Sequence, residues 1–318
     1  MKGSGNACCY RPQGTRRRGS PARPLRPSRG RRMKPASSHQ PLAYGAAIER
    51  AAALIAGADA LVVAAGAGMG VDSGLPDFRG NAGFWKAYPA LAAEGTAFMD
   101  IASPAAFQSN PRRAWGFYGH RLALYRATVP HAGFELLRKW GSAKACGYFV
   151  FTSNVDGQFQ KAGFDPLRID ECHGSIHHMQ CLTPCSQRTW RAAGFRPSID
   201  AARCELLGML PACPHCGGPA RPNILMFDDW DWIDSRREAQ AARRQNWLEK
   251  ARHPVVIEIG AGVNVATVRH FANRVVLRHK GSLIRINPRE PYVSHLDGVG
   301  IAGGALRTLM AIDSVLSP

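Results

Sequence analysis

The chain has 318 residues, of which 45% are hydrophobic, and a formal net charge of +18. This length and composition suit one large domain, or one domain with a smaller inserted module, and provide ample material for a core. No apolar run approaches the ~20 residues that a membrane-spanning helix requires, and no apolar stretch follows the charged N-terminus as in a signal peptide. We therefore expect a cytoplasmic protein that does not act at a membrane.

More than half of the net positive charge lies in residues 1–34, which hold eleven Lys or Arg and no Asp or Glu. A segment so rich in Arg, Pro, Gly and Ser buries too little apolar surface to offset its ordering entropy, so we expect a disordered basic tail. It can be a non-specific polyanion contact, a targeting peptide, or a start-site artefact with Met33 as the true first residue. We favour the last, which argues against nucleic acid as the main partner and leaves residues 35–318 as the folded domain.

Short apolar runs that end in glycine or polar residues recur along the chain. They predict buried parallel strands at Ala60–Ala65, Gly147–Thr152, Val255–Ile259 and Ser282–Ile286. Helical segments lie between them, with Ala47–Ala56 before the first strand and Ala302–Leu316 after the last. This alternation predicts an α/β fold with a doubly wound, Rossmann-like parallel sheet, whose ligands bind beyond the carboxyl ends of the strands.

The first predicted strand ends in the glycine-rich turn Gly66-Ala67-Gly68. Closely spaced glycines allow backbone N–H groups and a helix N-terminus to approach a diphosphate. The dehydrogenase spacing is not met, because Val71 stands where its third glycine falls, and a simple tight turn explains the pattern equally well. The segment Ser73–Gly80 (SGLPDFRG) follows directly, and in isolation it would be a solvated loop with an ion pair.

The second predicted strand ends in Ser153-Asn154-Val155-Asp156-Gly157. Asp156 can accept hydrogen bonds from a carboxamide and Asn154 can orient a water or a ribose hydroxyl, although an Asx-turn is the alternative. His173 follows, and a neutral imidazole can take a proton from a hydroxyl near pH 7. We assign no catalytic role to His177 or His178.

From His173 to Phe227 the periodicity disappears and Cys, Pro and Arg accumulate, so we expect a small inserted module at about residues 176–226. Two close cysteine pairs within it can supply four thiolates to a structural zinc ion, with no position left open for water. The predicted ligands are Cys181, Cys185, Cys213 and Cys216. Cys204 and His215 are rival ligands.

In this order the motifs resemble the sirtuin family of NAD⁺-dependent protein lysine deacylases, from about Ala60 to Asn287. The resemblance implies that Asp156 holds the nicotinamide carboxamide, that Phe78 covers the ribose and that His173 is the base. It further implies NAD⁺ contacts by Gly66, Ala67, Gly68, Asp77, Phe78, Arg79, Ser153, Gly260, Gly262 and Asn287. The chain departs from the family where Ser153 replaces Gln and where Ala261-Gly262 replace Thr-Ser.

Residues 221–229 (RPNILMFDD) are similar to the family segment that pairs with the substrate backbone by β-augmentation, which implies substrate contacts at Ile224, Leu225 and Phe227. Asp228 and Asp229 replace its Gly-Glu, a change that stiffens the loop and adds a charge beside the peptide groove.

Tyr118-x-x-Arg121 resembles the motif of sirtuins that prefer succinyl, malonyl or glutaryl groups. Spacing of i, i+3 puts both side chains on one helix face, where Arg121 can pair with a carboxylate. The alternative is a surface Arg beside a packed aromatic.

The resemblance implies acylated-lysine proteins as substrates. In the implied reaction the acyl oxygen attacks the anomeric carbon and nicotinamide leaves. His173 then removes a proton from a ribose hydroxyl, and water releases lysine and O-acyl-ADP-ribose. Two alternatives stay open: NAD⁺ hydrolysis or ADP-ribosylation, and a non-catalytic NAD⁺-sensing module. The sequence does not predict the oligomeric state.

Overall fold

The computed structural model describes residues 42–77, 80–294 and 297–317. The predicted tail, Phe78 and Arg79 therefore lie outside the described residues. Across the described ranges, no helix combines the length and apolarity that crossing a bilayer would require.

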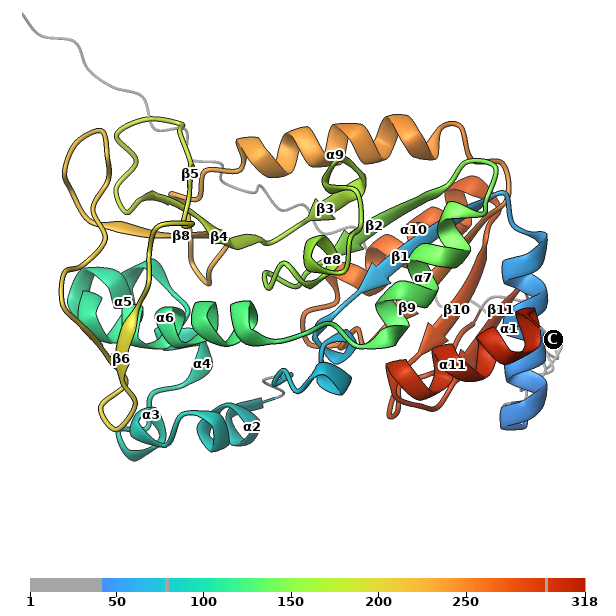
Figure 1. Cartoon of the computed structure of the whole chain (residues 1–318), viewed down its shortest axis with the longest axis horizontal. Helices are drawn as coiled ribbons and strands as arrows, with labels where there is room; N and C mark the ends of the chain where they lie inside the picture. Colours follow the sequence, from blue (N-terminus) through green and yellow to red (C-terminus); the bar gives the residue numbers. More distant parts are fainter. Residues whose placement is uncertain (1–41, 78–79, 295–296, 318) are drawn as a thin grey trace, which may run out of the picture. The chain divides into compact units, whose positions relative to one another are not determined.

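A six-stranded parallel sheet forms the centre of the fold, with strand order β11-β10-β9-β1-β2-β3 (Figure 1). This confirms the predicted α/β class. The strands are β1 (Ala60–Ala65), β2 (Tyr148–Thr152), β3 (Ile169–Glu171), β9 (Pro254–Ile259), β10 (Ser282–Ile286) and β11 (Gly298–Ile301). The chain leaves β1 towards β2 on one side and returns to β9 on the other, so the switch in strand order lies at β1.

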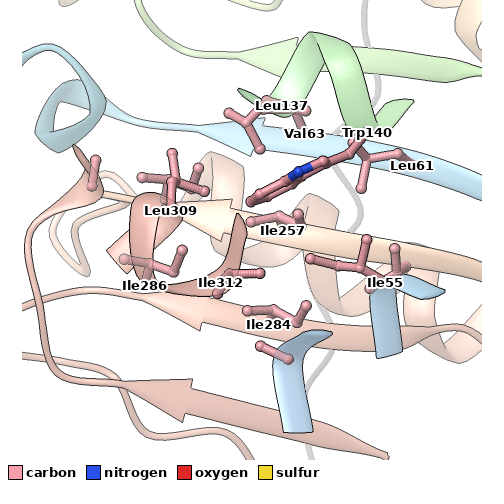
Figure 2. Packing of buried hydrophobic residues seen from close by; sticks show 14 of the residues in the cluster. Ile55, Leu61, Val63, Leu137, Trp140, Ile257, Ile284, Ile286, Leu309 and Ile312 are labelled. Carbon is pink, nitrogen blue, oxygen red and sulfur yellow. The ribbon is translucent and has the colours of Figure 1, made fainter. Parts of the chain in front are cut away.

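Successive side chains of the central strands point to opposite faces of the sheet, and both faces are covered by helices. Leu61, Val63 and Ile257 belong to one hydrophobic cluster, whereas Val62 and Val256 belong to another. Figure 2 shows the first cluster, in which Trp140 and the isoleucines of the strands pack together. Most of the helical residues of this first cluster come from α1 (Tyr44–Gly57), α7 (Ala132–Ser142) and α11 (Ala305–Leu316).

On the opposite face, α10 (Thr267–His279) packs on the sheet, and α9 (Ser235–Leu248) lies along β3 (Figure 1). Strand β3 is short and carries two buried carboxylates, Asp170 and Glu171. Arg244 and Arg236 of α9 pair with them. Burying these charges is tolerable because each has a partner.

A second layer contains a three-stranded antiparallel sheet, β5-β4-β8, and the hairpin β6-β7. The strands are β4 (Gly174–Cys181), β5 (Trp190–Arg191), β6 (Ser198–Asp200), β7 (Glu205–Leu207) and β8 (Ala220–Ile224). Its helices are α2 (Gly80–Ala87), α3 (Pro89–Ala93), α4 (Phe98–Ile101), α5 (Pro104–Ser109) and α6 (Pro111–Ala127). A third hydrophobic cluster, rich in aromatic rings, joins α6 to these small sheets. Helix α8 (Gln158–Lys161) follows the loop after β2.

Candidate active site

A cavity of about 620 Å³ opens at the carboxyl ends of β1, β2 and β9, where the strand order switches. Ala67, Asn154 and Gly262 line it from the loops after these three strands, and His173 and Tyr118 line it from the second layer. The volume is in the usual range for small-molecule sites. Two ends can be distinguished, which we name after the ligands that the sequence predicts for them: a cofactor end at the loops after β1 and β9, and an acyl end at α6 and the segment after β8.

Backbone rather than side chains builds the cofactor end. Gly260 has φ of +61°, and a Cβ there would lie 2.4 Å from the Cα of Gly68, so the two loops touch backbone to backbone. The N–H groups of Gly66 and Gly68 donate to the Ile259 and Gly260 carbonyls. These bonds occupy two of the donors that the sequence had suggested for a diphosphate.

The remaining backbone donors come from residues next to these glycines. Ala67, Ala261 and Gly262 line the cavity, and their N–H groups have no protein acceptor in the described part of the chain. Gly68 itself does not line the cavity. Its absence of a side chain serves the contact with Gly260 instead.

Asn287 is fully buried and likewise does not line the cavity. Its side chain donates to the Ala261 carbonyl over 3.0 Å and accepts from the backbone N–H groups of Arg289 and Glu290. Arg269 of α10 also donates to the Ala261 carbonyl twice, over 3.2 Å from Nε and over 3.0 Å from Nη2. Three donors from two side chains therefore hold the loop in which the sequence lacks the family's Thr and Ser.

The loop after β2 places Ser153, Asn154 and Asp156 in the cavity. The Asn154 amide donates to the Gly66 carbonyl, and Asp156 Oδ1 accepts from the Gln158 N–H over 2.9 Å. Burial raises the pKa of Asp156 to about 6, partly offset by the Gln158 hydrogen bond. Asp156 is therefore mostly ionised at pH 7, as an acceptor for an amide NH₂ must be.

His173 lies between the two ends and lines the same cavity. Burial lowers its pKa, while a hydrogen bond to the Ser153 backbone carbonyl acts in the opposite direction. The ring is therefore neutral near pH 7, the form in which an imidazole can accept a proton. Gly174 follows with φ of +80°, where a Cβ would meet the Asn223 carbonyl at 2.2 Å, so glycine is needed for β4 to reach β8.

Helix α6 supplies the acyl end, where Tyr118, Arg121 and Tyr125 line the cavity. Arg121 is 8% exposed and Tyr118 is 1% exposed, so the alternative of a surface arginine is wrong. The guanidinium carbon lies 5.1–5.7 Å from the ring centres of Phe117, Tyr118 and Tyr125. Burial raises the pKa of Tyr118 to about 12, so its phenol stays protonated.

Ile224, Leu225 and Phe227 line the opposite wall of the acyl end. The Leu225 N–H donates to the His173 carbonyl over 3.0 Å, and the Phe227 N–H donates to the Ala102 carbonyl over 3.0 Å. Both N–H groups are thus already used. A peptide strand that paired here would have to donate its own N–H groups to the carbonyls of this segment.

The turn after Phe227 refines the expectation for Asp228 and Asp229. Asp229 forms two 2.7 Å hydrogen bonds with Arg221, and both side chains are fully buried. Its charge is therefore neutralised within the turn. Asp228 is exposed and has φ of +53°, so it keeps the left-handed backbone that the family's glycine adopts freely.

The four predicted zinc ligands come together. The Sγ atoms of Cys181, Cys185, Cys213 and Cys216 all lie within 4.8 Å of one another. Four thiols so close to each other form a donor set that suits tetrahedral zinc. Of the rival ligands, Cys204 packs in the aromatic-rich cluster and His215 is exposed on a turn; neither is part of this group.

Asp77, Gly66 and Gly260 also line the cavity, as predicted from the sequence. Tyr125, Glu290 and the exposed Val263 and Val265 line it without having been predicted. Only Tyr125 left a signal in the sequence, because it stands four residues after Arg121 on a helix and so shares its face.

Comparison with known proteins identifies the family. Residues 66–266 match the model of the Sir2 family. An NAD-dependent protein deacetylase of Saccharolobus solfataricus is 31% identical over 228 residues, which cover 71% of this chain and 79% of the relative. An NAD-dependent protein deacylase of Thermococcus sibiricus is 27% identical, with coverage of 83% and 94%.

Solved structures agree on the fold. A Sir2 homologue in complex with NAD is 24% identical, has a TM-score of 0.63 and covers 84% of this chain and 93% of its own. A Sir2 protein with a deacetylated p53 peptide and 3′-O-acetyl-ADP-ribose has a TM-score of 0.58 at 19% identity, with coverage of 84% and 97%. With the model match spanning well over half of its length, the chain belongs to the Sir2 family.

Proposed function

We propose that this chain is an NAD⁺-dependent protein lysine deacylase that prefers acidic acyl groups such as succinyl or malonyl and acts in the cytoplasm. One observation carries the proposal: His173, Asn154, Asp156 and Arg121 line a single cavity. A candidate base, a candidate amide-binding carboxylate and a candidate anion-binding guanidinium thus line the same cavity. The names of the relatives, NAD-dependent protein deacylase and deacetylase, support the reaction class.

NAD⁺ would lie along the loops after β1, β2 and β9. The N–H groups of Ala67, Ala261 and Gly262 would donate to its diphosphate, and Asp156 would accept from its carboxamide. NAD⁺ supplies an electrophilic anomeric carbon with nicotinamide as the leaving group. His173, kept neutral by burial, would accept a proton from a ribose hydroxyl and so make that hydroxyl a nucleophile.

The acyl-lysine would enter between α6 and the segment after β8. Phe227 and Phe98, whose ring centres are 5.8 Å apart and nearly perpendicular, give this passage an apolar wall. Arg121 stands at the acyl end, where a guanidinium can make a charge-assisted pair with a terminal carboxylate. An acetyl group offers no such charge, so deacetylation would be the weaker activity.

Zinc would be held by the four clustered cysteines and would be structural, because four protein ligands leave no open position. Acylated proteins are the proposed partners. The Sir2 structure with a deacetylated p53 peptide supports this partner class.

The test is nicotinamide release from NAD⁺ with a succinyl-lysine peptide, with an acetyl-lysine peptide and with no peptide. Release that requires acyl-peptide and favours succinyl supports the proposal. Peptide-independent release would instead indicate NAD⁺ hydrolysis or ADP-ribosylation. NAD⁺ binding without any release would indicate a sensing module.

His173→Ala is the decisive variant in this assay. We expect release to fall by roughly 10²–10⁴-fold while NAD⁺ binding persists, because the general base is lost and the nucleotide contacts are not. His270→Ala, which removes an exposed histidine of α10, is the matched control and should retain full activity. Equal activity of both variants would overturn the role of His173.

A further inference from the structure

The C-terminal end of α6 is tied to the loop that carries Asp156. Helices leave their last carbonyls without intrahelical partners. Here Gln158 donates to the Tyr125 carbonyl over 3.0 Å, and Lys161 donates to the Arg126 and Thr128 carbonyls. Both donors belong to α8. The end of the acyl-binding helix is therefore capped by the element that directly follows the proposed carboxamide-binding loop.

Gln158 connects the two ends of the cavity. It is 1% exposed, its N–H donates to Asp156 Oδ1, and its side-chain amide donates to Tyr125. The same residue thus holds the carboxylate at one end and the backbone of α6 at the other. Buried bonds of this kind fix geometry, because breaking one leaves a polar group unsatisfied.

Arg121 is oriented by Tyr125, not by Tyr118. Its Nε donates to the Tyr125 hydroxyl over 2.9 Å, and both groups are buried. Tyr118 contributes a ring face 5.7 Å from the guanidinium carbon. The rings around Arg121 favour the cation without neutralising its charge. The bond through Nε constrains the rotation of the planar guanidinium, and hence the direction in which its paired donors point.

We propose that Tyr125 is the positioning residue that sets acyl selectivity, by holding Arg121 in the orientation that receives the terminal carboxylate of an acidic acyl group. This rests on the proposed function. Tyr125 acts through Arg121, with Gln158 as the tether that fixes the Tyr125 backbone against the Asp156 loop. The tyrosine of the Tyr118-x-x-Arg121 motif then serves as a packing surface for the cation.

The test uses Tyr125→Phe, which keeps the ring and removes the oxygen that accepts from Arg121. KM and kcat would be measured with peptides bearing succinyl-lysine, acetyl-lysine and succinamyl-lysine, the last being a neutral copy of succinyl. We expect KM for succinyl to rise about tenfold, with kcat and the KM values of both neutral peptides within about twofold of wild type. A hydrogen bond to a charged group is worth about this factor.

Three further variants make the result specific. In an Arg121→Met background, adding Tyr125→Phe should change nothing, because the two residues act as one unit. Gln158→Met should raise the succinyl KM in the same direction by about threefold. Tyr148→Phe is the matched control, since its buried hydroxyl also accepts one hydrogen bond, from Asp165, and it should leave the succinyl-to-acetyl KM ratio unchanged.

The outcomes separate the two proposals. If Arg121→Met raises the succinyl KM but Tyr125→Phe does not, the role of Tyr125 is wrong and the proposed acyl preference stands. If Arg121→Met has no effect on succinyl, both are wrong. Equal effects of Tyr125→Phe on succinyl and succinamyl peptides would also overturn the inference, because the lost interaction would then not involve charge.

Discussion

The two ends of the cavity are built from different materials. At the cofactor end the backbones of Gly68 and Gly260 touch, and main-chain N–H groups of Ala67, Ala261 and Gly262 line the cavity. At the acyl end, side chains of α6 and of the segment after β8 form the walls. A backbone site depends on how two loops fit together, whereas a side-chain site depends on single residues. A substitution in the loops of the cofactor end should therefore abolish binding there, whereas substitutions at the acyl end should alter binding gradually.

Loss of zinc should produce the largest effect, and it should fall on the acyl end. Cys181 ends β4 and pairs in register with Ala220 of β8, so the metal supports the strand that leads to Leu225. For Cys213→Ser/Cys216→Ser we expect the free energy of unfolding of the module to fall by on the order of 5 kcal/mol. Zinc content, melting temperature and peptide KM would be measured.

Cys146→Ser is the control for this experiment, because Cys146 lies outside the cluster. NAD⁺ binding by the double variant should survive if the sheet domain folds independently of the metal. Zinc retained at the wild-type level would rule out these ligands.

Gly260→Ala should break the cofactor end. The methyl group meets the Gly68 backbone, and the backbone at φ of +61° is strained for alanine, so we expect a loss of about 3 kcal/mol of stability. NAD⁺ affinity, followed by titration, should fall together with the melting temperature. Gly57→Ala, where a Cβ also meets nothing within 4 Å and which does not line the cavity, is the matched control. Similar behaviour of the two variants would argue against the interlocked loops.

Both catalysis and stability should depend on pH through Asp156 and His173, which line the cavity. Asp156 must be ionised and His173 neutral, so kcat/KM for NAD⁺ should fall as the pH drops through about 6, where Asp156 takes up a proton. Stability should respond in the opposite sense. The raised pKa of Asp156 means that the folded state binds the proton more tightly than the unfolded chain does. The resulting contribution to the free energy of unfolding is fully present below the pKa of Asp156 in the unfolded chain. It is lost as the pH rises through about 6.

Asp156→Asn should remove this pH dependence of stability and impair nicotinamide release. Urea unfolding at pH 5 and pH 8 would check the first expectation. A kcat/KM profile that stayed flat from pH 5 to 8 in the wild type would contradict the assignment of the acidic limb to Asp156.

The smallest effect should come from Asp228→Gly. Glycine relieves the left-handed backbone but adds freedom to the unfolded chain, so we expect a gain of only about 0.5 kcal/mol. Thermal melting would detect it. A loss of stability would mean that the exposed carboxylate makes a favourable interaction of its own.

The sequence predicted most of the fold, because four central strands are buried on both faces and therefore appear as continuous apolar runs. The edge strands β3 and β11 were not predicted. β3 contains Asp170 and Glu171, and the arginines that make their burial tolerable lie in α9, more than sixty residues later. β11 is a four-residue segment with two glycines. Neither has the composition of a strand.

For the site, the motifs identified which residues gather but not always what each one does. Gly68 and Asn287 belong to the site's architecture without lining the cavity, since both act on a neighbouring loop. Such indirect roles depend on contacts between segments about 190 or 26 residues apart, which spacing alone does not encode. Tyr125 was missed for a simpler reason, because the four-residue motif before it, Tyr118 to Arg121, already offered a tyrosine.

The contact between Gly68 and Gly260 has a consequence for engineering. Loops of this kind cannot be exchanged one at a time: a chimera that imports residues 66–74 from a relative must import the relative's counterpart of residues 260–262 as well, because the two backbones fit as a pair. The same constraint applies to sequence change in evolution, where a new conformation of one of these two loops requires a matching change in the other. The cavity wall formed by α6 consists of side chains, so a new acyl selectivity would require exchanging only a few of them, with Arg121 and Tyr125 changed together.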